Sequence, residues 1–368
     1  MSNSPAPINH DAKALGHKLP PQLRQSTIML QVPSRRPTIT DVAKLCGVTP
    51  ATVSRVLNKK KEFSTTEAVR KKIWNTASKV GYVPDLSARN LSRSSTHIIG
   101  LFASPQTHVA EGINESLIEG IASVLHAANY DVFFELSPMQ SDHPLPFWRF
   151  DGAILMQSPK PETVSQLDSR RVPYVCVNER VGHPVAQVLA DDAMGMKSAI
   201  EHLTKLGHKR IAYANVRAGY FSHYSVSERY DTLLAEARNK RVHLVPGHEM
   251  PFTDPAEFLR RAVIDGGATA IITYDHRIGV MILSAANTLG MRIPTDFSLI
   301  CFNDVFPVAL LNPPLTSVAV AGGEMGRRGA DLLLSSLRKA RPVSGTEIRI
   351  VEDLVIRGST APPRASKS

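Results

Sequence analysis

The chain has 368 residues, of which 43% are hydrophobic and 21% are charged. At about 100–200 residues per domain this length predicts two or three domains, and the apolar content excludes a chain that is disordered throughout. The three cysteines, Cys46, Cys176 and Cys301, lie far apart, which excludes a disulfide scaffold and favours a reducing compartment. No apolar run reaches the roughly 18–20 residues that a membrane helix needs. The first residues also lack a secretory signal, so we expect a cytoplasmic protein with no membrane contact.

The net charge of +10 is concentrated near the N-terminus. Residues 35–95 contain 13 Lys and Arg against 4 Asp and Glu, whereas the chain after residue 95 is close to neutral. A short basic segment on a neutral body is typical of a nucleic-acid-binding module joined to another domain. The alternative is a basic solvated face that has no partner.

The N-terminal part divides into a leader and the start of a helical domain. Residues 1–34 are rich in Pro, Ser, Gln and Asn and are predicted to be a disordered leader. Residues 35–83 have the apolar spacing of three helices. Thr40 is expected to be the N-cap of the first helix, which ends at Gly47 because glycine readily adopts positive φ. Its apolar stripe is predicted to consist of Val42, Ala43, Leu45 and Cys46.

Two further helices and a linker follow. Thr49 is expected to cap the second helix, with Pro50 in the first turn, where a missing N–H costs nothing. The third helix is predicted over residues 66–80. The side chains expected to face the core of these two helices are Val53, Val56, Leu57, Val69, Ile73, Trp74 and Ala77. Residues 84–95 are too polar for a core helix and are interpreted as a hinge helix or linker.

From Ile98 onward, short apolar runs rich in branched residues alternate with amphipathic helical segments. This alternation predicts parallel sheets that are covered on both faces. We expect residues 96–360 to form two α/β lobes, the first from about 96–190 plus 320–360 and the second from 191–319. Residues 361–368 are expected to be a tail.

The pair of short helices around Gly47 predicts a helix-turn-helix, whose second helix can enter a DNA major groove. Small residues allow close approach, hydroxyls reach phosphates, and the Arg55 guanidinium can read guanine. The residues of this helix that lie away from the core are Pro50, Ala51, Thr52, Ser54, Arg55 and Asn58. The alternative is an ordinary helical hairpin, which the neighbouring basic residues disfavour.

Several segments together resemble the LacI/GalR family of bacterial transcription regulators. They are TITDVAKLCGVTPATVSRVLN, STTEAVRKKIWNTASKVGYVPDLSARNL, VLADDAMGMKSAIEHLTKLGHKRIAYA, LGMRIPTDFSLICFND and EDLVIRGST, in the family's order. The resemblance implies an α+β multidomain fold: an all-α helix-turn-helix head with a hinge helix, then a two-lobed effector domain similar to type I periplasmic binding proteins. It also implies a homodimer that binds a palindromic operator in double-stranded DNA, and a small-molecule effector between the lobes.

The resemblance also implies functional residues. In the head and hinge we expect DNA contacts at Thr38, Thr40, Thr49, Ala88 and Leu91, with the leucine as a minor-groove wedge. For the effector, the resemblance points to Asp275 and Arg229. Asn178 and Tyr274 are further candidates because they follow strands at the expected lobe junction. The alternative for Asp275 and Arg229 is a structural ion pair between the two.

The sequence departs from the family's pattern at several places. The segment between Tyr130 and Gly152 is shorter than usual, and the loop after Phe102 lacks the common Asn-Pro-aromatic run. Ligand contacts from the first lobe are therefore not assigned. Cys301 stands where the family has glycine, and Asn303 stands where it has the first aspartate of a Phe-Asp-Asp motif. We interpret Cys301 as a small packed residue.

Motifs for catalysis and phosphate binding are missing, including GxSxG, GxxxxGK[ST], HExxH and GxGxxG after a strand. The pair Asp191–Asp192 fits helix capping better than a metal or acid/base site. We therefore predict no catalytic residue, metal or cofactor. The favoured function is a repressor that responds to a sugar or sugar acid, with a nucleoside or purine as second choice. The alternative is a cytosolic α/β small-molecule-binding protein or enzyme with an accessory nucleic-acid-binding head. Without a leucine heptad after Thr360, we expect a dimer rather than a tetramer.

Overall fold

The computed structural model describes residues 35–57, 63–83, 95–103, 112–136, 150–156, 161–182, 185–216, 223–339 and 345–364. The chain divides into two compact units, Met1–Arg89 and Asn90–Ser368. The predicted leader, Asn58 and nearly all of the predicted hinge, with Ala88 and Leu91, lie outside the described residues, as does most of the shortened segment after Tyr130.

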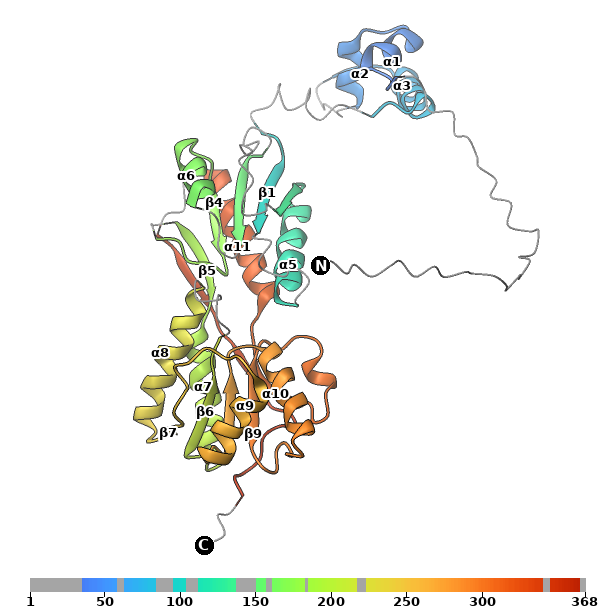
Figure 1. The fold of residues 1–368 in the computed structure, drawn as a ribbon. Helices are drawn as coiled ribbons and strands as arrows, with labels where there is room; N and C mark the ends of the chain where they lie inside the picture. The colour runs from blue at the N-terminus through green and yellow to red at the C-terminus, as the bar shows by residue number, and fades with distance from the viewer. Residues whose placement is uncertain are drawn as a thin grey trace, which may run out of the picture. The chain divides into compact units, whose positions relative to one another are not determined.

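The head consists of α1 (Ile39–Cys46), α2 (Pro50–Leu57) and α3 (Glu67–Val80) (Figure 1). The cap of α1 is Thr38, so the prediction of Thr40 was wrong. The Thr38 backbone N–H donates to the Asp41 carboxylate at 2.8 Å, and the Asp41 N–H donates to the Thr38 hydroxyl at 3.4 Å. This reciprocal pair satisfies two backbone groups, whereas Thr40 lies already within the first turn. Gly47 ends α1 with φ 69°, as expected.

A small apolar core joins the three helices of the head. The buried residues are Val42, Ala43, Cys46, Val53, Val56, Ile73 and Ala77. Two predicted core residues are instead exposed, Leu45 by 59% and Trp74 by 44%. Each residue turns a helix by about 100°, so Leu45 is one such step from buried Cys46 on α1, and Trp74 is one such step from buried Ile73 on α3.

The body contains two sheets of six described strands. The first has the order β11-β5-β4-β3-β1-β2, and its described neighbours are all parallel. Its strands are β1 (Ile98–Ala103), β2 (Asp131–Leu136), β3 (Gly152–Met156), β4 (Tyr174–Val177), β5 (Ala186–Ala190) and β11 (Glu347–Ile350). The second sheet, β12-β10-β9-β8-β6-β7, is parallel except for the antiparallel β10–β12 pair. Its strands are β6 (Arg210–Ala214), β7 (His243–Leu244), β8 (Ala270–Thr273), β9 (Ser298–Phe302), β10 (Thr316–Ala319) and β12 (Asp353–Val355).

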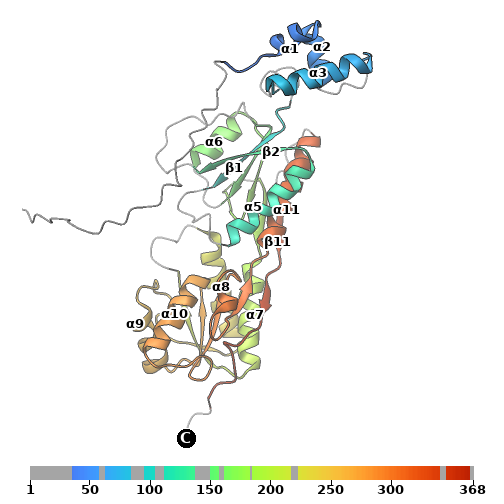
Figure 2. The same ribbon diagram turned by 90° about the vertical axis from the view of Figure 1, so that its right-hand side faces the viewer.

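Helices cover both faces of each sheet (Figures 1 and 2). On the first sheet, α5 (Ile113–Ala127) and α11 (Gly322–Lys339) pack side by side on one face, and α6 (Pro161–Ser169) packs on the other. On the second sheet, α7 (Asp192–Lys205) and α8 (Tyr224–Asn239) cover one face. The opposite face carries α9 (Pro255–Leu259), the π-helix η2 (Arg260–Asp265), α10 (His276–Thr288) and the 3-10 turn η3 (Val308–Leu310). The two covered sheets are the two predicted α/β lobes.

The described chain passes between the lobes at three crossovers: β5 to α7, β10 to α11, and β11 to β12. Residues 320–360 are predicted from the sequence to belong to the first lobe. Helix α11 and strand β11 do lie there, but β12 pairs with β10 of the second sheet. The Ser359 carbonyl also accepts from the Leu299 N–H at 2.8 Å. Residues 353–360 therefore belong to the second lobe, because β10 offers a free sheet edge to the returning chain.

Candidate functional site

The second helix of the head, α2, presents most of the residues predicted to contact DNA. Pro50, Ala51 and Arg55 are exposed, while Val53 and Val56 on the opposite side are buried in the core. The Arg55 guanidinium lies over the Phe63 ring at 5.3 Å, which restricts its direction. Thr52 and Ser54 are half-buried on the same helix.

The threonines flanking the helices have local roles as well. The Thr49 hydroxyl accepts from the Thr52 N–H at 3.2 Å, so Thr49 caps α2 as expected. The Thr38 hydroxyl donates to Asp41 at 2.8 Å, and the hydrogen bonds from Thr38 lower the pKa of Asp41. Thr40 is exposed and projects from the first turn of α1. The caps satisfy backbone N–H groups at the starts of α1 and α2 and so stabilise both helices.

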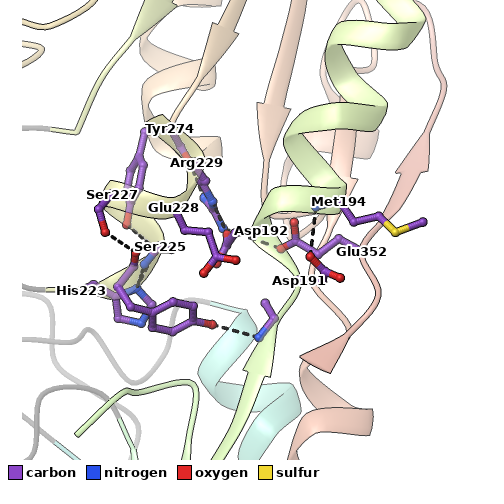
Figure 3. Close-up of polar contacts among 12 residues, drawn as sticks. Asp191, Asp192, Met194, His223, Ser225, Ser227, Glu228, Arg229, Tyr274 and Glu352 are labelled. Carbon is purple, nitrogen blue, oxygen red and sulfur yellow. Dashed lines mark hydrogen bonds and ion pairs between the residues drawn. The ribbon is translucent and has the colours of Figure 1, made fainter. Parts of the chain in front are cut away.

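In the body, Arg229 of α8 is almost fully buried in a cluster of polar groups (Figure 3). Its Nε donates to Asp192, its Nη1 donates to the Tyr274 carbonyl at 2.6 Å, and its Nη2 lies 3.8 Å from Glu352 Oε1. Its guanidinium also stacks on the Phe302 ring at 4.0 Å. Arg229 thus has structural partners in the absence of any effector.

Asp275 follows β8 and is the N-cap of α10. Its Oδ1 accepts from the Ile278 N–H at 2.9 Å, and its Oδ2 accepts from Arg277 Nε at 3.0 Å and Nη2 at 2.9 Å. The ion pair considered between Asp275 and Arg229 is not formed. Asp275 Oδ2 therefore already accepts two hydrogen bonds, whereas Oδ1 accepts one and can accept a second.

Asn178 and Tyr274 lie at the two ends of a hydrogen-bond chain that joins the lobes. Asn178, after β4, accepts at its carbonyl from His223 Nε2 at 2.8 Å. The His223 Nδ1 atom therefore faces the Ser225 hydroxyl at 2.6 Å as an acceptor, and that hydroxyl lies 3.0 Å from the Tyr274 Oη. The chain runs from the first lobe, through the start of α8, to the carboxyl end of β8.

Further contacts connect the N-terminal part of α8 to the first lobe. The Tyr224 hydroxyl accepts from the Ala190 N–H at 2.9 Å and donates to Asn178 Oδ1 at 3.3 Å. Glu228 forms an ion pair with Arg349 of β11. We call these contacts, with the His223–Asn178 hydrogen bond, the interlobe clasp. Through them, the start of α8 connects the second lobe to the first by hydrogen bonds and an ion pair.

Sequence reasoning missed His223, Tyr224, Ser225 and Glu352. The sequence feature that could have indicated the first three is the run of polar residues at the start of the helix that follows β6. Ligands of open α/β sheets bind at the carboxyl ends of the strands, where such residues lie. The interpretation of Asp191 as a cap is correct, since it accepts from the Met194 N–H at 3.1 Å. Asp192, its neighbour, instead pairs with Arg229 in the interior.

The described residues contain neither a metal-binding cluster of His, Cys, Asp and Glu nor a helix long and apolar enough to span a membrane. Cys301 is fully buried between the second-lobe strands and helices, and burial raises the pKa of its thiol. This fits the interpretation of Cys301 as a packed residue. What the geometry offers is an exposed helix-turn-helix in one unit and two lobes joined by polar contacts in the other.

Both units are similar to parts of known transcriptional regulators. Residues 38–85 match the family model "Bacterial regulatory proteins, lacI family", and residues 200–360 match "Periplasmic binding protein-like domain". The probable HTH-type transcriptional repressor ExuR of Bacillus subtilis is 26% identical over 345 residues, covering 88% of this chain and 99% of that protein.

Solved structures show the same fold. The lac repressor dimer bound to operator and the anti-inducer ONPF has a TM-score of 0.74 at 20% identity, covering 89% of this chain and 100% of that one. The complex of the transcriptional regulator CelR with cellobiose has a TM-score of 0.59 at 23% identity, covering 88% and 100%. These relatives are regulators rather than enzymes, which confirms the prediction of a non-enzymatic protein. The chain thus joins a helix-turn-helix head that matches the lacI family of bacterial regulatory proteins to a body that matches the periplasmic-binding-protein-like domain.

Proposed function

We propose that the protein is a repressor that binds a palindromic operator as a homodimer through α2 of each head. The observation that carries this proposal is the exposed outer face of α2, with Arg55 on it, in a strongly basic segment of the chain. Arg55 reads a base edge, Pro50 and Ala51 make apolar contacts, and Thr38, Thr40, Thr49, Thr52, Ser54 and Asn58 contact the backbone or neighbouring bases. The related lac repressor is a dimer on its operator, which supports the same arrangement here.

The linker is part of this proposal. Residues 84–95 form a hinge helix on DNA, with Ala88 and Leu91 in the minor groove, because an isolated helix of this length is marginal in water. A leucine inserted between base steps unstacks them and bends the duplex. The arrangement of the lobes in the two bodies then affects how well the hinge helices bind the operator.

The effector site lies at the lobe junction and takes a sugar or sugar acid. Tyr274 and Asp275 come from the carboxyl end of β8, where open α/β sheets bind ligands, and Asn178 comes from the facing lobe. Relatives bound to cellobiose and to ribose support a carbohydrate. Arg229 can share its remaining N–H groups with hydroxyls or a carboxylate while it keeps Asp192.

An effector acts by favouring one arrangement of the lobes. The interlobe clasp between α8 and the first lobe would form or break as the lobes move, and the effector shifts operator affinity by its differential affinity for the two arrangements. Whether the effector releases the protein from DNA or strengthens binding depends on which arrangement it prefers.

The function is tested with DNA from upstream of the gene. In a gel-shift assay, a palindromic site should bind far more tightly than one half-site, because two linked heads share a single association step. A thermal-shift screen against sugars, sugar acids and nucleosides then identifies the effector, since a ligand of the folded state raises its apparent stability. Equal affinity for half-site and palindrome would reject the dimeric mode.

The effector residues are tested once a ligand is found. Asp275→Ala and Arg229→Ala should lose the effector response, but Arg229→Ala also removes the cation beside two buried carboxyl groups, Asp192 and Glu352. The same measurements are therefore made on two conservative variants, Asp275→Asn and Arg229→Lys. Asparagine can still cap α10. The expected result is a loss of response with operator affinity retained. A folded variant that keeps the full response at unchanged effector concentration removes that residue from the site.

A further inference from the structure

The buried cluster around Arg229 lies where the chain crosses between the lobes. Asp192 is the first residue of α7, directly after the first crossover, and Glu352 is on the third crossover, between β11 and β12. The second crossover begins at the end of β10, next to Val318. Movement of one lobe against the other must bend these segments. We therefore expect lobe movement to change the surroundings of the residues in this cluster.

The cluster contains one cation and two carboxyl groups. The side chains of Asp192 and Glu352 are 0% exposed and that of Arg229 is 5% exposed. Arg229 donates to Asp192 and to the Tyr274 carbonyl, whereas its distance of 3.8 Å to Glu352 is too long for a hydrogen bond. Among the described residues neither carboxyl oxygen of Glu352 has a hydrogen-bond partner. A second buried negative charge here would be nearly uncompensated.

Helix α7 packs directly against the Glu352 carboxyl group at Gly195. A Cβ added to Gly195 of α7 would lie 2.0 Å from Glu352 Oε2 and 2.7 Å from Val318 Cγ1. Glycine is thus needed at this position for α7 to approach the carboxyl group. The contact joins α7, β10 and the third crossover at one point.

The charged groups around Glu352 favour its neutral form. Burial raises the pKa of Glu352 well above its ordinary value of 4.5, and Asp192 raises it further. Asp191 of α7 and Glu228 of α8 act in the same direction, and only Arg229 opposes them. Asp192 holds the direct bond to Arg229, so the cation is already neutralised.

We propose that the Glu352 carboxyl carries a proton in this arrangement of the lobes and releases it when the crossovers move apart, so that lobe movement is linked to pH. The link to an effector rests on the proposed function, whereas the protonation of Glu352 at the third crossover does not. Low pH favours the arrangement seen here, and high pH favours one in which Glu352 reaches water.

The first test is the thermal unfolding of the full chain from about pH 5 to about pH 9. A group whose pKa is higher in the folded than in the unfolded state stabilises below its unfolded pKa, and this stability is lost as the pH rises toward the folded pKa. The melting temperature of the wild type should therefore fall with rising pH relative to that of Glu352→Gln, which cannot ionise. Glu119→Gln, at an exposed position of α5, is the control and should follow the wild type. A constant difference between wild type and Glu352→Gln at every pH overturns the proposal.

Asp192→Asn is the second variant and needs no substitution at Glu352. It removes the negative charge beside Glu352 and leaves the Arg229 cation to pair with Glu352, which lowers the pKa of Glu352. The fall in melting temperature with rising pH should therefore be smaller and occur at lower pH. An unchanged pH profile in a folded Asp192→Asn protein overturns the proposal.

Lobe movement is measured by hydrogen exchange in peptides that cover residues 190–196 and 350–354. Protection of the wild type relative to Glu352→Gln should fall as the pH rises. Equal relative protection at every pH overturns the link to lobe movement. None of these measurements uses DNA or an effector, so a failure of the proposed regulatory function would appear separately, in the gel-shift assay.

Discussion

At the scale of single residues, Arg55 is the sharpest test of the DNA-binding surface. Its guanidinium is exposed on α2 and stacks on Phe63, so it is directed before DNA arrives. Arg55→Ala should weaken operator binding by about 1–3 kcal/mol and relax selectivity at one position of each half-site. Equilibrium binding to a set of single-base operator variants measures both effects. Arg238→Ala, at an exposed position of α8, is the matched control and should leave binding unchanged. Unaltered selectivity in Arg55→Ala would remove this residue from base recognition.

At the scale of elements, the contact between α5 and α11 depends on glycine. A Cβ at Gly326 would lie 2.2 Å from the Leu117 carbonyl oxygen of α5, a backbone atom that cannot move aside. Gly326→Ala should therefore destabilise the protein by about 1–3 kcal/mol. In Gly323→Ala, one turn earlier, the nearest atom lies 3.5 Å away, so alanine should be neutral or slightly stabilising. Denaturant unfolding of the two variants compares them directly, and equal stabilities would contradict the close-packing account.

At the scale of the whole molecule, the separation of charge predicts how binding responds to salt. The head and linker carry the excess of Lys and Arg while the body is nearly neutral. The logarithm of operator affinity should fall linearly with the logarithm of salt concentration, by about 0.9 per neutralised phosphate. Lys71→Ala, on the exposed side of α3, should weaken all sequences alike and reduce this slope by about one. Affinity that is independent of salt, or a slope that Lys71→Ala leaves unchanged, would argue against phosphate contacts by the head.

The type and order of most elements could be predicted from the amino-acid sequence, because their causes are local. Thr49 and Pro50 start α2 and Gly47 ends α1 through interactions within a few residues. The branched apolar runs at β1, β3, β8 and β9 are buried on both faces, which is what parallel strands between helices require. The family resemblance, carried by motifs along most of the chain, agrees with the matched family models of head and body.

Which side chains contact each other depends on the packing of segments that are far apart in the sequence. Arg229 pairs with Asp192, which is 37 residues earlier in the chain, and lies beside Glu352, so no local pattern indicates the cluster. The placement of β12 on the second sheet was equally hidden, because the edge of β10 that it pairs with exists only once the second sheet has formed. Leu45 and Trp74 are exposed because packing selects one face of each helix, and apolar character alone does not say which. Side-chain partners are set by distances in space, and these arise when segments far apart in sequence pack together.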